Sequence, residues 1–223
     1  MFRPSYLKEG PGIAKDAPPK TGAALAADIL AREFWQIVKV NFLFVLCALP
    51  VITFGAARAA MARCTMNMAR DVPNDVWSDF RLALQQDFAR NTGFGLAELG
   101  LVALALTLLR KGAAVGSLSL AVLAMLLLCV TVCFFQNFWP QAAALDLPAW
   151  ATAKNAWLLC LLRPACTLAL LAMDAVLLLP CVLLFPLSLP VWLLLPFGLS
   201  SFFASLLCWA GCKRYLIRTD SIH

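Results

Sequence analysis

The stretch NFLFVLCALPVITFG, residues 41–55, is apolar over most of its length and is interrupted near its end by Pro50. An apolar helix of this kind can enter the hydrocarbon core of a membrane. Because proline lacks the amide hydrogen that a helix uses, we expect a kink at Pro50 unless neighbouring groups satisfy the freed carbonyl. Trp35 and Lys39 precede the stretch, where an aromatic ring and a long amine typically mark the membrane boundary. The first predicted span is therefore residues 36–54.

The rest of the chain is similarly apolar. Of its 223 residues, 62% are hydrophobic and 13% charged, whereas a soluble domain is roughly half apolar and a quarter charged. We predict an all-α fold, a polytopic transmembrane helical bundle with about five spans, each long enough to cross a hydrocarbon core of ~30 Å. One membrane domain, residues 21–218, follows a mobile tail over residues 1–20. The predicted spans are residues 36–54, 92–109, 113–135, 165–185 and 190–210.

Short connections indicate how the spans follow one another. Arg110-Lys111-Gly112 leaves so little chain between the second and third spans that they must be antiparallel neighbours. Pro186 and Pro190 mark a break in the final apolar run. Basic residues concentrate in the first connection and after the last span, so the positive-inside bias predicts a cytoplasmic C-terminus and, with five spans, an N-terminus outside.

Two connections contain candidate surface helices, over residues 75–90 and 149–162. In the first, apolar residues separated by three or four positions form one helical stripe: Trp77, Phe80, Leu84 and Phe88. The stripe suits either a helix in the bilayer interface or one packed on the other spans, and both alternatives bury the same residues. Arg81 and Arg90 add positive charge that could recruit a cytoplasmic partner. These six residues are the predicted partner or interface face.

Two acids fall inside predicted spans, Glu98 and Asp174. Charged groups are costly inside a bilayer and usually face the bundle interior or a cavity. We expect desolvation to favour the protonated form of Asp174. Its functional interpretation is a proton- or substrate-sensing site, and the alternative is a structural acid that hydrogen-bonds a hydroxyl such as Thr131 or Ser119.

Other chemistry finds little support in the sequence. The nine cysteines lie mostly in apolar runs, where cysteine acts as a small hydrophobe, and the one histidine, His223, ends the chain. Neither phosphate-binding glycine loop occurs. The net charge of +6 comes from scattered basic residues rather than a basic patch. We therefore expect no metal, no cofactor, no nucleic-acid partner and no catalytic site, and we do not expect an enzyme.

The first part of the chain resembles the YesL-like family of bacterial membrane proteins. The resemblance is carried by Asn41, Leu49-Pro50, Thr53 with Gly55, Arg70-Asp71 and the aromatic helix from Trp77 to Phe88, and less distinctively by KNAWLLCLLRP at residues 154–164. The proline-rich tail and the cysteine-rich spans depart from the family pattern.

The resemblance implies a multi-pass protein of the bacterial cell membrane whose molecular function is not known. Genes of the family often stand beside genes for sugar uptake and glycan degradation. This association implies a non-enzymatic accessory to carbohydrate uptake, in contact with the lipid bilayer and with the permease or ATPase of a sugar ABC transporter. The alternative is that the chain is itself a small permease or transporter subunit.

Overall fold

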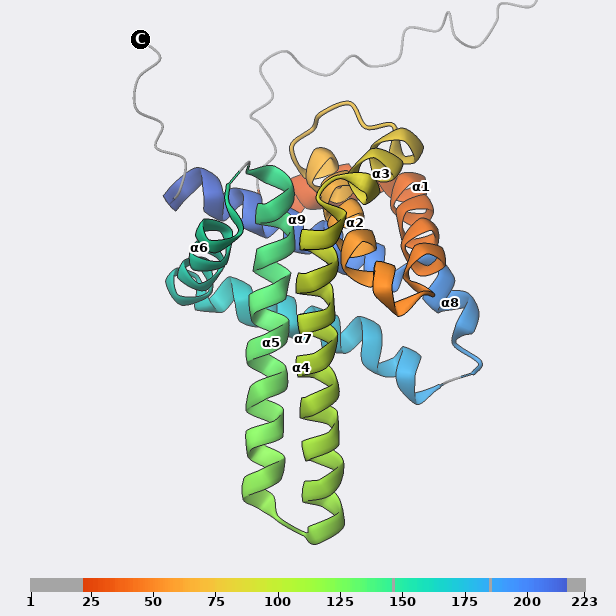
Figure 1. Cartoon of the computed structure of the whole chain (residues 1–223). Helices are drawn as coiled ribbons and strands as arrows, with labels where there is room; N and C mark the ends of the chain where they lie inside the picture. Colours follow the sequence, from red (N-terminus) through yellow and green to blue (C-terminus); the bar gives the residue numbers. More distant parts are fainter. Residues whose placement is uncertain (1–21, 146, 185, 216–223) are drawn as a thin grey trace, which may run out of the picture.

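The computed structural model describes residues 22–145, 147–184 and 186–215, and every regular element in these ranges is helical (Figure 1). The all-α prediction is confirmed. The predicted tail over residues 1–20 lies outside the described residues. The elements are α1 (Ala23–Ala48), the short 3-10 helix η2 (Val51–Thr53), α2 (Phe54–Ala69), α3 (Val76–Gln85), α4 (Phe88–Val115), α5 (Leu118–Ala144), α6 (Ala149–Leu162), α7 (Pro164–Leu183), α8 (Leu189–Leu194) and α9 (Pro196–Tyr215).

Helix α1 ends two residues before Pro50, so the predicted kink is instead a helix end. Pro50 cannot donate the hydrogen bond that would continue the helix, and its ring would clash with the preceding turn. The hydroxyl of Thr53 lies within hydrogen-bonding distance of the carbonyls of Cys47 and Pro50, and the backbone amide of Thr53 also donates to the Pro50 carbonyl over 2.9 Å. The chain then turns through η2 into α2.

Helix α2 is the centre of the molecule, although its sequence suggested a charged connection on the surface. Ten of its residues are buried, and it packs against α1, α3, α4, α5 and α9. Its alanines allow these neighbours to approach closely, as small residues do at helix contacts in membranes. Toward α9, the hydroxyl of Thr65 lies 2.9 Å from the hydroxyls of both Ser201 and Ser205. The buried apolar cluster around α2 includes Ile37, Val40, Phe44, Met61, Phe80 and Phe202.

Helices α2 and α4 meet at a pair of glycines. A Cβ atom on Gly55 would lie 2.0 Å from the carbonyl oxygen of Asn91, and one on Gly95 would lie 2.2 Å from the Cα of Gly55. Both distances are far inside van der Waals contact, so the two backbones touch where neither residue has a side chain. Thr53 therefore helps to end α1, and Gly55 allows α4 to pack closely against α2.

Helices α4 and α5 form a long antiparallel hairpin that extends beyond the other helices (Figure 1). The predicted turn at Arg110-Lys111-Gly112 is wrong, because α4 continues to Val115 and the chain reverses at Gly116 and Ser117. Gly116 has a φ of 68°, a left-handed conformation that glycine adopts without a steric penalty. Ser117 then caps α5 by accepting a hydrogen bond from the amide of Leu120.

Three helices in the described ranges are long and apolar enough to cross a membrane: α4, α5 and α7. With 28 residues, α4 is about 42 Å long at 1.5 Å per residue, which exceeds a hydrocarbon core of ~30 Å. Helix α4 contains the predicted span 92–109, and α7 contains nearly all of 165–185. Most of the predicted span 113–135 lies in α5, but its first residues belong to the end of α4 and to the turn at Gly116 and Ser117. The other two predicted spans fall on α1 and on α8 with α9, and they stay predictions.

Candidate functional site

The first of the acids predicted inside the spans, Glu98 of α4, forms a largely buried ion pair. Arg58 of α2 donates from Nη2 to Oε1 of Glu98 over 3.2 Å, and each side chain is 12% exposed. The indole nitrogen of Trp139 in α5 donates to the other oxygen, Oε2, over 2.8 Å. Arg58 and Glu98 each stand one helical turn beyond the glycine contact, so the close approach of the two helices lets the arginine reach the carboxylate.

The second acid, Asp174 of α7, is 5% exposed and accepts hydrogen bonds from neutral groups. Ser200 of α9 donates to Oδ1 over 2.6 Å, and the amide of Gln136 in α5 donates to Oδ2. The same amide nitrogen lies 2.7 Å from the Ser200 hydroxyl. The hydroxyl partners suggested by sequence, Thr131 and Ser119, make other hydrogen bonds: Thr131 donates to Leu127, and Ser119 pairs with Ser117. Asp174 is therefore fixed by α5 and α9.

One cavity of about 150 Å³ brings the two predicted acids together. Phenylalanine rings and aliphatic side chains cover part of its wall, and the charged and polar groups converge on the remainder. The lining residues are Phe44, Phe54, Arg58, Glu98, Val132, Gln136, Asp174, Leu178, Phe197 and Ser200. Arg58, Gln136 and Ser200 were not among the predicted site residues, and they come from three different helices.

The charges and hydrogen bonds of the cavity's polar groups do not fully match one another. Arg58 is the one cation and Glu98 and Asp174 are the two anions among its described lining residues. The Nε atom of Arg58 is buried and has no hydrogen-bond partner among the residues that the structure describes. The cavity thus contains one unused donor and, with both acids ionised, one more negative charge than positive charges. We call these five residues (Arg58, Glu98, Gln136, Asp174 and Ser200) the cavity cluster.

The six residues of the predicted partner face are divided between two helices. The single helix predicted over residues 75–90 is wrong: α3 ends at Gln85, and α4 begins at Phe88. Between them Gln86 is extended and Asp87 is left-handed, with a φ of 52°, a conformation that aspartate tolerates better than most residues. Two hydrogen bonds hold this joint, from the Asn91 side chain to the Gln86 carbonyl (3.1 Å) and from the Asn91 amide to the Asp87 carbonyl (2.9 Å).

The predicted stripe also divides into buried and exposed parts. Phe80 is 2% exposed, and Leu84 packs against the same apolar cluster around α2. Trp77 is 68% exposed and shares the outer face of α3 with Arg81 and with Leu82, which is 67% exposed. This outward face of α3 (Trp77, Ser78, Arg81, Leu82 and Gln85) lines a shallow hollow of about 300 Å³. Phe80 and Leu84 are therefore packed against other helices, which is one of the two alternatives for the stripe, whereas Trp77 is not packed in this way.

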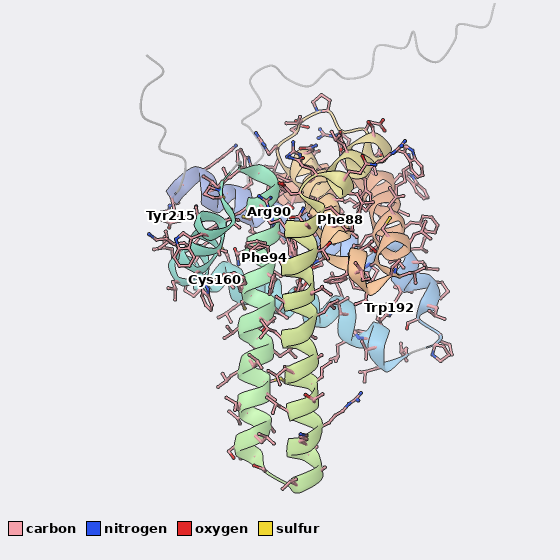
Figure 2. The ribbon with its side chains drawn as sticks, in the orientation of Figure 1. Phe88, Arg90, Phe94, Cys160, Trp192 and Tyr215 are labelled. Carbon is pink, nitrogen blue, oxygen red and sulfur yellow. The ribbon has the colours of Figure 1, made fainter. Side chains whose placement is uncertain are left out.

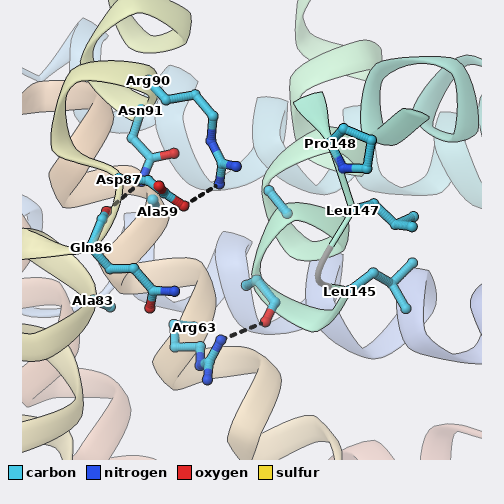
Figure 3. A pocket seen from close by; sticks show the side chains of 12 residues that line it. Ala59, Arg63, Ala83, Gln86, Asp87, Arg90, Asn91, Leu145, Leu147 and Pro148 are labelled. Carbon is cyan, nitrogen blue, oxygen red and sulfur yellow. Dashed lines mark hydrogen bonds and ion pairs between the residues drawn. The ribbon is translucent and has the colours of Figure 1, made fainter. Parts of the chain in front are cut away.

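Phe88 and Arg90 lie at the start of α4. Tyr215, the last residue of α9, lies toward the same end of the molecule (Figure 2). Arg90 pairs with Asp87 over 2.9 Å. A pocket of about 350 Å³ opens here (Figure 3). Its lining residues include Asp87, Arg90, Arg63 of α2, and Leu145, Leu147 and Pro148 between α5 and α6. Arg63 reaches across that pocket to the carbonyl of Ala143 over 3.2 Å.

Further charged groups pair at the same end. Arg32 of α1 pairs with Asp71, and the Trp209 ring lies 4.7 Å from the Arg70 guanidinium carbon and 5.2 Å from the Lys213 amine. The hydrogen-bonded and Coulombic influence of Glu33 and Asp71 raises the pKa of Arg32 above its ordinary value, so this arginine is charged at all physiological pH values. We call this region the charged end: Arg32, Arg63, Arg70, Asp71, Asp87, Arg90 and Lys213.

Asn41, the first residue of the apolar stretch 41–55, is fully buried and joins three helices. Its side-chain amide donates to the Trp192 carbonyl in α8 over 2.9 Å, and its oxygen accepts from the Gly198 amide in α9 over 2.8 Å. In the sequence, Asn41 contributed to the family resemblance but had no predicted structural role. A polar amide at the start of an apolar run was the available signal, because such a group needs partners once it is buried.

A family model described as "Protein of unknown function, DUF624" matches residues 30–108. The match covers most of α1, all of α2 and α3, and most of α4, so it includes Arg58 and Glu98 but not Asp174. It is consistent with the resemblance to the YesL-like family. No curated protein and no solved structure matches the chain. The match and the three apolar helices together describe a membrane protein whose function is not established.

Proposed function

We propose that this chain is a non-enzymatic, multi-pass protein of the bacterial cell membrane that supports carbohydrate uptake. The resemblance to the YesL-like family supports the carbohydrate role. The partner we propose is the permease or ATPase of a sugar ABC transporter, contacted beside the lipid bilayer, and nucleic acid is not a proposed partner. The observation that carries a partner role is the outward face of α3.

That face combines properties that protein contacts use. Trp77 and Leu82 are two-thirds exposed while the opposite face of α3 is buried against α2. Arg81 lies beside them, and tryptophan and arginine are the residue types most enriched at the energetic centres of protein interfaces. The helix is held by Phe80 in the apolar cluster, so it presents this face rigidly, which lowers the entropic cost of binding.

The competing explanation is anchoring, because tryptophan and arginine also favour the interface of an anionic membrane. Affinity purification from crosslinked membranes distinguishes the two. Arg81→Glu combined with Arg90→Glu should abolish recovery of a permease or ATPase while the protein stays inserted. The matched control is Arg110→Glu with Lys111→Glu, which reverses the same number of charges near the far end of the α4–α5 hairpin.

Recovery of the same partners by both double variants would reject the partner role. Loss of membrane insertion only in the Arg81 and Arg90 variant would support anchoring instead.

The second candidate, a small permease or transporter subunit, is favoured by the cavity cluster. A cavity lined by aromatic rings, carboxylates, an amide and a hydroxyl has the composition of a site for a small polar molecule. Sugar uptake by the purified chain alone in vesicles would favour this function over the accessory role. An enzyme is not proposed.

A further inference from the structure

The cavity cluster has a charge that its own residues do not neutralise. Glu98 faces a full positive charge on Arg58, at 3.2 Å, and a second donor on Trp139. Asp174 receives its hydrogen bonds from a hydroxyl and an amide, both neutral. The titratable or charged groups around Asp174 are Arg58 of α2 and Glu98 of α4, which line the same cavity, and Cys133 of α5. Arg58 cannot fully compensate both acids.

A negative charge on Asp174 that no positive charge matches would raise the free energy of the folded protein, because the side chain is buried. Asp174 is 5% exposed and lies in α7, one of the three helices apolar enough to cross a membrane. A buried charge without a matching partner is strongly destabilising, and buried acids respond by taking up a proton. Within the described part of the chain, Glu98 has a direct ion pair and Asp174 has none.

We propose that the cavity cluster binds one exchangeable proton, carried by Asp174. The proton comes from a hydronium ion, whose O–H bond breaks to leave a water molecule as the new O–H bond forms at Oδ1. The cluster is left with one positive and one negative group. The Ser200 hydroxyl then accepts from Oδ1 instead of donating to it, and turns its own hydrogen toward a backbone carbonyl of the preceding turn, as serine does in helices. Gln136 keeps its bond to Oδ2, so only one hydroxyl rotates.

The cavity has room for the water that such an exchange requires. Its volume of about 150 Å³ is well above the ~10–15 Å³ that one water needs, and its charged and polar lining residues can hydrogen-bond to water. A metal ion is a weaker occupant, since the described residues contain no group of three or more His, Cys, Asp or Glu side chains arranged to hold one. This inference is independent of the partner role of α3.

Infrared difference spectroscopy of the purified full chain in lipid tests the proposal. A protonated carboxyl group has its own carbonyl stretching band, which shifts in D₂O. We expect such a band at neutral pH in the parent protein and in Asp87→Asn, a control on the charged end, and its loss in Asp174→Asn. The amide of asparagine fills the same volume and keeps a hydrogen bond, so this variant should fold.

A second variant and a sodium titration make the test sharper. Ser200→Ala removes a hydrogen bond from both forms of Asp174, and the bond to the charged carboxylate is the stronger of the two. The band should therefore persist to higher pH, with about tenfold tighter proton binding. Sodium at constant pH should leave the parent band unchanged. Absence of an Asp174-dependent band at every pH where the helices remain folded would overturn the proposal. A band abolished by sodium would also overturn it, in favour of a cation site.

Discussion

Replacing Gly95 by alanine should separate α2 from α4. A Cβ atom there would lie 2.2 Å from the Cα of Gly55, whereas ordinary contact begins at 3.4 Å. The distance between these atoms must therefore grow by about 1.2 Å, the difference of the two values. Neither atom belongs to a flexible side chain, so the helix backbones themselves must move.

Two opposing effects set the size of the change. Alanine is favoured over glycine inside a helix by about 1 kcal/mol, and overpacking a tight contact costs about 1–3 kcal/mol. Because the added Cβ atom would clash with backbone atoms, we take the upper overpacking cost of about 3 kcal/mol. After the helix preference of about 1 kcal/mol is subtracted, Gly95→Ala should be destabilised by about 2 kcal/mol. Gly93 lies in the same helix, and a Cβ atom on it would meet nothing within 4 Å. Gly93→Ala should therefore be stabilised by about 1 kcal/mol.

The two variants differ by about 3 kcal/mol in the expected free energy of unfolding. Reversible unfolding in mixed detergent micelles, followed by circular dichroism, measures this difference. The reasoning is refuted if Gly95→Ala proves as stable as Gly93→Ala, because α2 and α4 would then not touch at the glycines. Gly55→Ala, which places a Cβ atom 2.0 Å from the Asn91 carbonyl oxygen, should behave like Gly95→Ala.

Three further predictions concern the buried acid, a buried thiol and the orientation in the membrane. Asp174→Leu removes the acceptor of Gln136 and Ser200, so unfolding experiments should show a loss of about 1–3 kcal/mol; a leucine variant as stable as the parent would contradict the buried position. Burial raises the pKa of the Cys64 thiol to about 12, and only the thiolate reacts with maleimide. Mass spectrometry at about pH 8 should therefore find Cys64 labelled only after unfolding, and its rapid labelling in the folded protein would refute this. Both ends of the described chain lie at the charged end (Figure 1), so reporters fused to either terminus should be active in the cytoplasm; an N-terminal reporter active outside would restore the orientation expected from five spans.

The sequence alone determined the features that depend on local periodicity and composition. Runs of apolar residues predict α4, α5 and α7, because a helix crossing hydrocarbon must be apolar along its whole length. Pro50 predicts the interruption after α1, and Pro148 the start of α6, whose predicted range of 149–162 matches Ala149–Leu162. The two acids of the cavity could also be found from sequence, since each is a rare charge inside an apolar run.

Only the tertiary structure decided what these elements bury. The arginines of α2 suggested a surface connection, yet its alanines and Gly55 let five helices pack around it. Arg58 meets Glu98 from 40 positions away, and Gln136 reaches Asp174 from 38. The division of the predicted surface helix at Asp87 likewise depends on where α4 must point to form this packing. Contacts between residues so far apart in the sequence depend on which helices lie side by side. The pattern of residues within one helix does not determine which helices those are.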